Sequence, residues 1–148
     1  MAIQLQIRRG TTAQNESFIG AAGEISLDTD TMTLRIHDGQ HAGGFVIPTI
    51  VAEQKPTADN NYTWYKKYSN GWVEQGGVTI KRSINCIQTI LLPIVMCDAN
   101  YTVISTTMWD SVPPSDVANA ILNKTQETFG IYDWQHSYSH WYVSGMAA

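Results

Sequence analysis

Apolar and polar residues alternate over short stretches near the start of the chain, a pattern typical of strands with one buried face. The first stretch is "IQLQI" (3–7). The second, "GEISLDTDTMTLRIHDG" (23–39), alternates on both sides of an Asp-rich centre, so it predicts a hairpin with a polar turn at residues 28–31. The apolar positions of its two arms are Ile25, Leu27, Leu34 and Ile36.

A short helix and one more extended segment complete this part of the chain. Thr11 and Gln14 have the spacing of a capping box, which predicts a helical turn over about residues 12–18. The stretch "GGFVIPTIV" (43–51) is apolar and reads as extended. These roughly fifty residues hold few large side chains, and a unit of that size is rarely stable alone. We therefore expect other copies of the chain to supply the missing core.

The stretch "YKKYSNGWVEQGG" (65–77) contains an Asn-Gly step between strand-forming residues, the strongest short-range signal for a hairpin. A type I′ turn centred on Asn70 and Gly71 places Lys67 opposite Glu74, and opposite charges across a strand pair support that register. Large exposed apolar patches mark interaction sites, so one aromatic face of this hairpin is predicted to pack on a neighbouring copy.

Four further extended segments are expected after this hairpin. They cover residues 86–92, 101–107, about 119–132, and 137–144. The stretch "SDVANAILNKTQ" (115–126) leaves two alternatives, because it keeps helical spacing after Pro113 and Pro114 but also alternates as a strand. We favour the strand.

Composition divides the chain into two parts. Among all Phe, Trp and Tyr residues, only Phe18 and Phe45 precede position 62. The stretch "EQKPTADNN" between the parts is polar, contains Pro56 and lacks apolar periodicity, which predicts a linker. The predicted organisation is an N-terminal β module (1–52), this linker (53–61), and a C-terminal β module (62–148).

Charge and hydropathy exclude several classes of partner. The chain of 148 residues has 9 Lys and Arg and a formal net charge of −4. Nucleic-acid binding needs a basic face, so no nucleic-acid partner is expected. The longest apolar run, at 90–97, contains Pro93 and is too short to insert into a membrane. The start lacks the apolar stretch of a signal peptide, so we expect synthesis in the cytoplasm without an encoded export route.

No group of residues predicts catalysis or a bound metal. The stretches "HDGQH" (37–41) and "HSYSH" (136–140) each place two His four positions apart, but neither reads as a helix and neither has a third ligand nearby. Asp28 and Asp30 form a carboxylate pair of the kind that glycosidases use, but carboxylates in turns are mostly solvated. We therefore expect no enzyme activity, no catalytic residue, no metal and no cofactor.

The last predicted strand has two different faces. One face holds Ser137, Ser139, Trp141 and Val143, and its two large residues suit a core. The other is a row of His136, Tyr138, His140 and Tyr142, whose side chains have apolar bodies and polar tips. Such a row suits stacking against a sugar, and equally suits a subunit interface. Together with Trp109 and Trp134 on predicted loops, this row forms the set of candidate receptor-binding residues.

The first 39 residues carry a resemblance to a known family. The stretch "IQLQIRRGTTAQNESFIGAAGEISLDTDTMTLRIHDG" resembles the N-terminal domain of bacteriophage tropism determinants and related tail fibres. The shared features are the Arg-Arg-Gly-Thr-Thr step at 8–12, the Gly23-Glu24 entry to a strand, the Asp-rich turn, and the closing Asp38-Gly39.

The second part looks like the knob at the C-terminal tip of many phage and prophage tail fibres. The shared features follow in order: the Asn-Gly hairpin ending at Gln75-Gly76, Leu92-Pro93, the Tyr-Thr-Val strand at 101–103, Thr125 to Phe129, and Trp141 to Gly145. The chain departs from this pattern because it lacks a Trp between that Gln and Gly. It also lacks the long shaft that usually separates the two ends of such fibres.

The resemblance implies a mostly β protein with two small β modules, an intertwined homotrimer, and a β-sandwich-like C-terminal knob. Residues 1–52 would serve attachment and trimerisation and contact other virion structural proteins. The knob would bind a host cell-surface glycan or protein. The expected function is therefore that of a virion protein that attaches to the host without chemistry. The alternatives are a head fibre that decorates the capsid without a receptor role, and a small polysaccharide-degrading enzyme.

Overall fold

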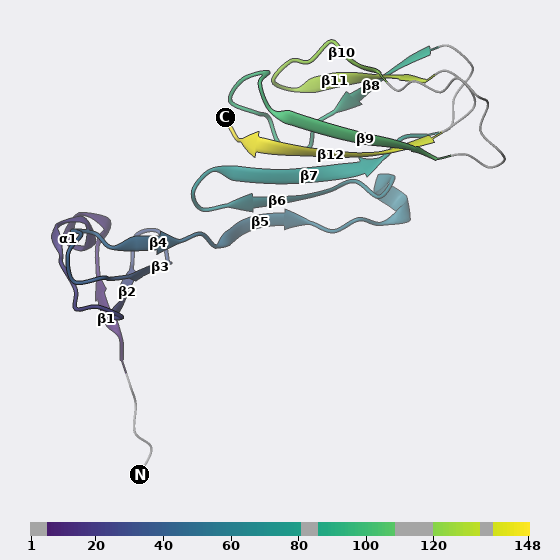
Figure 1. Cartoon of the computed structure of the whole chain (residues 1–148). Helices are drawn as coiled ribbons and strands as arrows, with labels where there is room; N and C mark the ends of the chain where they lie inside the picture. Colours follow the sequence, from purple (N-terminus) through teal and green to yellow (C-terminus); the bar gives the residue numbers. More distant parts are fainter. Residues whose placement is uncertain (1–5, 81–85, 109–119, 134–137) are drawn as a thin grey trace. The chain divides into compact units, whose positions relative to one another are not determined.

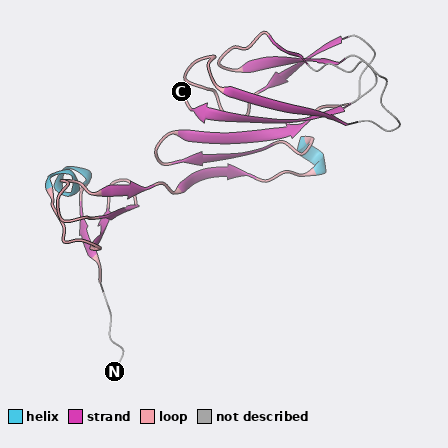
Figure 2. Ribbon diagram, viewed as in Figure 1, coloured by secondary structure: helices cyan, strands magenta, loops and turns pink. Residues whose placement is uncertain are grey.

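The structure, a computed structural model, describes residues 6–80, 86–108, 120–133 and 138–148. The chain divides into two compact units, Met1–Thr49 and Ile50–Ala148. Strands are the main regular structure of both units, which confirms the predicted mostly β fold (Figures 1 and 2). Within the described ranges, none of the helices has the length and apolar character needed to cross a bilayer.

The first unit is a four-stranded sheet in the order β1-β2-β3-β4, with one short helix. Its elements are β1 (Arg8–Gly10), α1 (Thr12–Ser17), β2 (Ile25–Asp28), β3 (Thr33–Ile36) and β4 (Phe45–Ile47). The predicted capping box is present, because the N–H of Gln14 donates to the hydroxyl of Thr11 at 3.3 Å and the N–H of Thr11 donates to Oε1 of Gln14 at 2.9 Å. The predicted helix is therefore confirmed.

The predicted hairpin around the Asp-rich turn is also confirmed, since Ile25 pairs with Ile36 and Leu27 with Leu34. The expected strand at 3–7 is not confirmed. Its first three residues lie outside the described ranges, Gln6 and Ile7 have no regular structure, and the first described strand begins at Arg8. Arg8, Arg9 and Gly10 form β1, which pairs in parallel with β2.

The interior of the first unit is polar. The side chains buried between α1 and the sheet are those of Asn15, Ser26, Asp28, Thr33, Arg35 and His37. Several of them pair with one another: Arg35 Nη2 donates to Asp28 Oδ2 at 3.0 Å, and Ser26 donates to Asn15 Oδ1 at 2.8 Å. Burying a polar group is costly unless it is hydrogen-bonded in this way. Nε of Arg35 is buried without a hydrogen-bond partner among the described residues.

The apolar side chains of this unit point to the opposite face of the sheet. The strand registers align them in two rows, Ile25–Ile36–Phe45 and Leu27–Leu34–Ile47, which we call the apolar face. Ile36 remains 43% exposed and Phe45 56%. The alternation predicted from the sequence is therefore present, but its apolar side has no cover within the described part of this unit.

The second unit is a sandwich of a five-stranded and a three-stranded sheet. The larger sheet has the order β5-β6-β7-β12-β9, and its strands are β5 (Ile50–Gln54), β6 (Trp64–Tyr68), β7 (Trp72–Val78), β12 (Tyr138–Met146) and β9 (Thr102–Met108). The smaller sheet has the order β10-β11-β8, with β10 (Ala120–Leu122), β11 (Thr128–Asp133) and β8 (Cys86–Leu91). Figure 1 shows the two sheets as the layers of this unit.

The hydrophobic core of the second unit lies between these sheets. Trp141 and Val143 come from the larger sheet, and Phe129 and Ile131 from the smaller one. The rings of Phe129 and Trp141 meet edge to face, with their centroids 5.6 Å apart. Leu92, Met96 and Tyr101, from the connections, close the cluster. This core gives the second unit the apolar interior that the first unit lacks.

The segment predicted as a linker belongs to the second unit. The two units divide between Thr49 and Ile50, whereas the expected boundary was at residue 52. Glu53 and Gln54 are the last residues of β5 and pair with β6. Residues Ala58–Asn60 form a 3-10 turn, η1, between these two strands. The polar composition of 53–61 thus reflects a hairpin connection at the edge of a sheet.

The Asn-Gly hairpin forms, but its register is one residue away from the prediction. Lys66 lies opposite Glu74, and Lys67 lies opposite Val73. Only Gly71 of the pair has positive φ, at 84°, and its N–H donates to the carbonyl of Tyr68 at 3.0 Å. The connection is therefore a longer loop whose left-handed residue is Gly71, in place of a two-residue type I′ turn.

The later strands follow the prediction with two changes. The expected segment at about 119–132 contains two strands, β10 and β11, separated by a turn that includes Asn123 with φ of 51°. The segment 43–51 is likewise divided, because β4 ends before Pro48 and β5 belongs to the other unit. In the ambiguous stretch 115–126, residues 120–122 form a strand, and residues 115–119 lie outside the described ranges.

Candidate functional site

The last strand of the chain, β12, has the two faces that its sequence predicts. Ser139, Trp141 and Val143 are buried towards the smaller sheet. Tyr138, His140 and Tyr142 point away from the core, onto what we call the outer face of the larger sheet. β12 lies between β7 and β9, so this row crosses the interior of the sheet rather than its edge.

Neighbouring strands extend this outer face with uncharged residues. The β9 register places Met108 beside Tyr138, Thr106 beside His140, and Ile104 beside Tyr142. On the other side, Val78 pairs with His140 and Gly76 with Tyr142. The outer face is therefore broadly apolar around the row, with hydroxyl and imidazole groups set into it.

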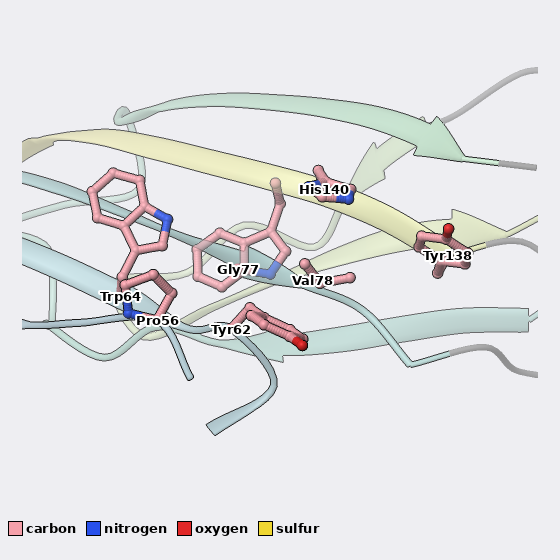
Figure 3. Close-up of a pocket in the computed structure, with 8 residues that line it drawn as sticks. Pro56, Tyr62, Trp64, Gly77, Val78, Tyr138 and His140 are labelled. Atoms are coloured by element: carbon pink, nitrogen blue, oxygen red, sulfur yellow. The ribbon is translucent and has the colours of Figure 1, made fainter. Parts of the chain in front are cut away.

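A cavity of about 450 Å³ opens on this part of the second unit. Its lining residues are Pro56, Tyr62, Trp64, Gly77, Val78, Tyr138, His140 and Trp141. Figure 3 shows the labelled side chains of Trp64, Tyr62, Tyr138 and His140 around the opening. This volume lies within the range of about 300–1,000 Å³ that is usual for small-ligand sites. None of these eight described residues carries a carboxylate, ammonium or guanidinium group.

The position of Trp64 depends on the glycine across the strand pair. Trp64 on β6 pairs with Gly76 on β7. A Cβ atom at Gly76 would lie 2.8 Å from Nε1 of Trp64 and 2.8 Å from the carbonyl oxygen of Trp141. Real Cβ contacts are longer, so the indole occupies space that only glycine leaves open. Its ring centroid lies 6.2 Å from that of Tyr142.

Glu74 is a carboxylate of the outer face, and two tyrosines hold it. The hydroxyl of Tyr68 donates to Oε2 at 3.1 Å, and the hydroxyl of Tyr142 donates to Oε1 at 3.2 Å. The hydrogen bond to Glu74, helped by burial, raises the pKa of Tyr68. Burial is the main cause that raises the pKa of Tyr142. Both phenols therefore stay protonated at neutral pH and act as donors to this carboxylate.

The connection between β5 and β6 forms one wall of the cavity and is closely held. The N–H of Tyr62 donates to the carbonyl of Thr57 at 2.8 Å, and the N–H of Thr63 donates to that of Asn60 at 3.0 Å. The Asn60 side chain accepts from the N–H of Thr57 at 2.9 Å and donates to the carbonyl of Lys55 at 2.9 Å. These bonds fix the backbone from which Tyr62 projects.

The structure brings together part of the predicted receptor-binding set. Tyr138 and His140 line the cavity, with their ring centroids 6.3 Å apart. Tyr142 shares their face but is engaged by Glu74 and Trp64 beside the cavity. His136, Trp109 and Trp134 lie outside the described residues.

Sequence reasoning missed Pro56, Tyr62 and Trp64, which complete the cavity. Two of these residues fall inside or directly after the segment that was interpreted as a linker. The aromatic stretch "NYTWY" (61–65) gave no usable signal, because Tyr62 is left-handed and lies in a turn before β6 begins at Trp64. Strand alternation therefore does not predict that these two side chains line one cavity.

The other candidate groups have structural roles in the first unit. His37 is buried, its Nδ1 accepts from the N–H of Gly20 at 3.3 Å, and its Nε2 lies 2.9 Å from the hydroxyl of Ser26. His41 contacts the carboxylate of Asp38 at 2.6 Å. Asp28 is paired with Arg35. Among the residues that the structure describes, no cluster of three or more His, Cys, Asp or Glu is arranged to hold a metal.

Comparison with known proteins relates the first unit to phage fibres by sequence. Residues 5–41 match the family model of the Major tropism determinant N-terminal domain. A "Tail fiber receptor-binding protein" of Bordetella phage BPP-1 is 56% identical over 45 residues, which are 30% of this chain. The chain spans 12% of the length of that relative. The predicted resemblance of the N-terminal part is therefore confirmed.

Comparison with solved structures relates the chain to bacterial fibres by fold. A structure of the C-terminal part of the P. aeruginosa R2 pyocin fibre matches 97% of this chain and 37% of its own, with a TM-score of 0.54 and 15% identity. An N-truncated R2-type pyocin tail fibre matches 66% of this chain and 39% of its own, with a TM-score of 0.50 and 15% identity. These matches show that the chain shares a β-rich fold with tail fibres.

Proposed function

We propose that the chain is a phage tail-fibre protein that attaches to the host cell surface through the outer face of its second unit. The observation that carries this proposal is the uncharged, aromatic cavity on an otherwise exposed sheet face. Binding surfaces favour Trp and Tyr, because these side chains combine a large apolar area with a polar tip. The name of the Bordetella phage relative, a receptor-binding protein, points the same way.

The first unit would join copies of the chain into a trimer and connect them to other virion proteins. Its apolar face supports this role, because four of the six side chains in its two rows are exposed and the other two, Leu27 and Leu34, are half-buried, while the unit's buried side chains are polar. Covering that face with other copies would provide the core that the unit lacks. Three second units on one particle would then bind a repetitive surface with increased avidity.

The mechanism is binding without catalysis. The described part of the cavity lining includes no carboxylate, whereas most glycosidases need two beside the scissile bond. Glu74, on the same face, has both carboxylate oxygens engaged by tyrosine hydroxyls. A host-surface glycan or protein is therefore retained at this face and left unchanged.

The first test of this proposal is the attachment of the fluorescently labelled full chain to a panel of bacteria. We expect it to decorate a susceptible strain, and Tyr138→Ala to reduce that decoration at least tenfold. Val95→Ala is the matched control, because Val95 is 41% exposed and its carbonyl accepts from the N–H of Ala148, beyond the end of β12 that is distant from Tyr138. It should leave decoration unchanged.

Two results would overturn the proposal. Decoration of phage capsids but of no bacterium would indicate a head fibre that decorates the capsid. Release of reducing sugar from capsular polysaccharide would indicate a degrading enzyme. Solution mass should be measured for each variant, because a loss of trimer in Tyr138→Ala would assign the outer face to packing between copies.

A further inference from the structure

Tyr62 adopts a backbone conformation that tyrosine rarely occupies. Its φ is 54°, and that of the preceding Asn61 is 53°, so two successive residues without a glycine are left-handed. Asparagine tolerates this region, but a bulky side chain is disfavoured there. Left-handed residues of this kind persist where the surrounding structure fixes them, and they cluster at functional sites.

The surroundings of Tyr62 do fix it. Besides the bonds within the loop, the N–H of Val78 on β7 donates to the carbonyl of Asn61 at 3.3 Å. The side-chain amide of Gln54 on β5 donates to the carbonyl of Thr63 at 2.9 Å. The loop is therefore attached to two strands, yet the Tyr62 side chain it presents is 54% exposed. Packing does not explain the choice of an aromatic residue at this position.

The cavity beside Tyr62 is suited to a ligand of one chemical type. Trp64, Pro56 and Val78 offer apolar surfaces, while Tyr62, Tyr138 and His140 offer hydrogen-bonding tips. A pyranose ring has the complementary pattern, with apolar C–H faces and hydroxyl groups around its rim. An acidic sugar would place its charge where the described residues of the lining provide no cation, and an unpaired charge is costly to desolvate.

A peptide fits this cavity less well than a sugar. Extended peptides usually add to the edge of a sheet, where free backbone groups form a ladder with them. The strands under the cavity, β7 and β12, are interior strands of the larger sheet. β12 is paired on both sides, and past the end of the β6 ladder the N–H of Val78 on β7 donates to the carbonyl of Asn61. Recognition here must use side chains, which is how aromatic residues and hydroxyls meet a sugar.

We propose that the cavity binds one uncharged pyranose unit of a host-surface glycan, with Tyr62 as the residue that closes it. This inference rests on the proposed function and specifies its ligand. Tyr62 contributes the ring and the hydroxyl of one wall, and the held loop keeps that wall in place before the sugar arrives. Preorganisation of this kind increases affinity, because no loop has to be ordered on binding.

The test is ligand-observed saturation-transfer NMR on the full chain. The probes are the methyl pyranosides of glucose, galactose, mannose, rhamnose and N-acetylglucosamine, with methyl glucuronide as the charged comparison. At least one uncharged pyranoside should receive saturation, and methyl glucuronide should receive at least tenfold less. Transfer to none of the five, or equal transfer to the glucuronide, would overturn the proposal.

The informative variant is Tyr62→Gly, because it separates binding from stability. Glycine is at ease at positive φ, so the thermal midpoint should stay the same or rise, while saturation transfer should fall at least tenfold. Val95→Ala should keep the wild-type transfer. Unchanged transfer in Tyr62→Gly would contradict the assignment, and a lower solution mass would show that another copy of the chain occupies the cavity.

Cell attachment of the same variants distinguishes this inference from the function it rests on. If the chain attaches to bacteria but transfers saturation to no uncharged pyranoside, the proposed function is supported and the assignment of a sugar to this cavity is contradicted. If the chain neither attaches to bacteria nor transfers saturation to any uncharged pyranoside, the proposed function and the sugar assignment are both wrong. Attachment that uncharged pyranosides inhibit, and that is lost in Tyr62→Gly, is the outcome we expect.

Discussion

The backbone is left-handed at both Gly71 and Tyr62, but this conformation suits glycine and is disfavoured for tyrosine. Gly71 has a φ of 84° and ends the loop between β6 and β7, where glycine is the natural choice. Tyr62 has a φ of 54°, which is disfavoured for tyrosine, and its side chain is 54% exposed. The Gly71 position therefore serves folding, whereas the Tyr62 position is best explained by binding.

Gly71 provides a prediction about stability at the residue scale. Gly71→Val and Gly71→Asn both add a Cβ, which would lie 3.0 Å from the terminal methyl of Met146, so that contact is common to the two variants. Asparagine tolerates the left-handed region, but a β-branched residue does not. Valine should therefore reduce the free energy of unfolding of the second unit by at least about 1 kcal/mol more than asparagine.

Chemical denaturation of the two Gly71 variants measures this difference, with the tryptophan fluorescence of the second unit as the signal. Trp64, Trp72 and Trp141 all lie in that unit, so the signal reports on it directly. Equal stability of the valine and asparagine variants would mean that positive φ at Gly71 is not required.

The sequence located this turn but not its register. Asn-Gly predicts a hairpin in either case, and the loop length decides which residues face each other. The expected pairing of Lys67 with Glu74 relied on charge, yet the observed pairing of Lys66 with Glu74 also brings opposite charges together. Charge complementarity between two adjacent lysines and one glutamate fits both registers, so it cannot choose between them.

At the scale of the elements, the hairpin of β2 and β3 shows what alternation does and does not reveal. Alternation places Ile25, Leu27, Leu34 and Ile36 on one face, as the structure confirms. It does not reveal which face the rest of the unit covers. Here α1 covers the polar face, because the side chains of Asn15, Asp28 and Arg35 find hydrogen-bond partners there.

The buried ion pair makes the stability of the first unit depend on pH. Burial raises the pKa of Asp28, but hydrogen bonds from Thr12, Arg35, and the N–H groups of Thr31 and Asp30 hold it below its usual value. The unfolded chain should have the ordinary aspartate pKa of about 3.9. Ionised Asp28 therefore stabilises the fold above about pH 4, and that stabilisation is lost as the pH falls through the folded pKa.

We predict that acid loosens the first unit before the second. Hydrogen exchange of β2 and β3, corrected for the intrinsic rate at each pH, should increase below about pH 4, while β7 and β12 stay protected. Asp28→Asn should already weaken the first unit at pH 7 and flatten this acid response. Glu16→Gln, an exposed change on α1, is the control. An identical acid response in Asp28→Asn would exclude Asp28 as the source.

At the scale of the whole molecule, the two units differ in how they are stabilised. The second unit has its own hydrophobic core between two sheets. The first unit buries polar side chains and leaves most of its two apolar rows exposed. The sequence indicated this imbalance, since the first fifty or so residues hold few large side chains. It could not indicate the cavity, because the cavity depends on a loop that composition alone classed as a linker.

A charge on the apolar face should separate the copies of the chain. Ile36→Glu places a carboxylate in the centre of one of the two rows, where covering it would leave it unpaired. We expect single chains whose second unit keeps its wild-type tryptophan fluorescence. Ile19→Glu is the matched control, because Ile19 is 53% exposed in the first unit but lies outside the two rows. It should leave the assembly intact.

The measurement that tests the central claim most directly is the solution mass of the full chain by light scattering. The proposed fibre needs copies joined through the first unit, and the resemblance to phage fibres sets their number at three. We predict three times the chain mass of 16.5 kDa, unchanged on dilution through the micromolar range. A monomer at micromolar concentration would contradict the proposed trimer and the multivalent attachment that depends on it.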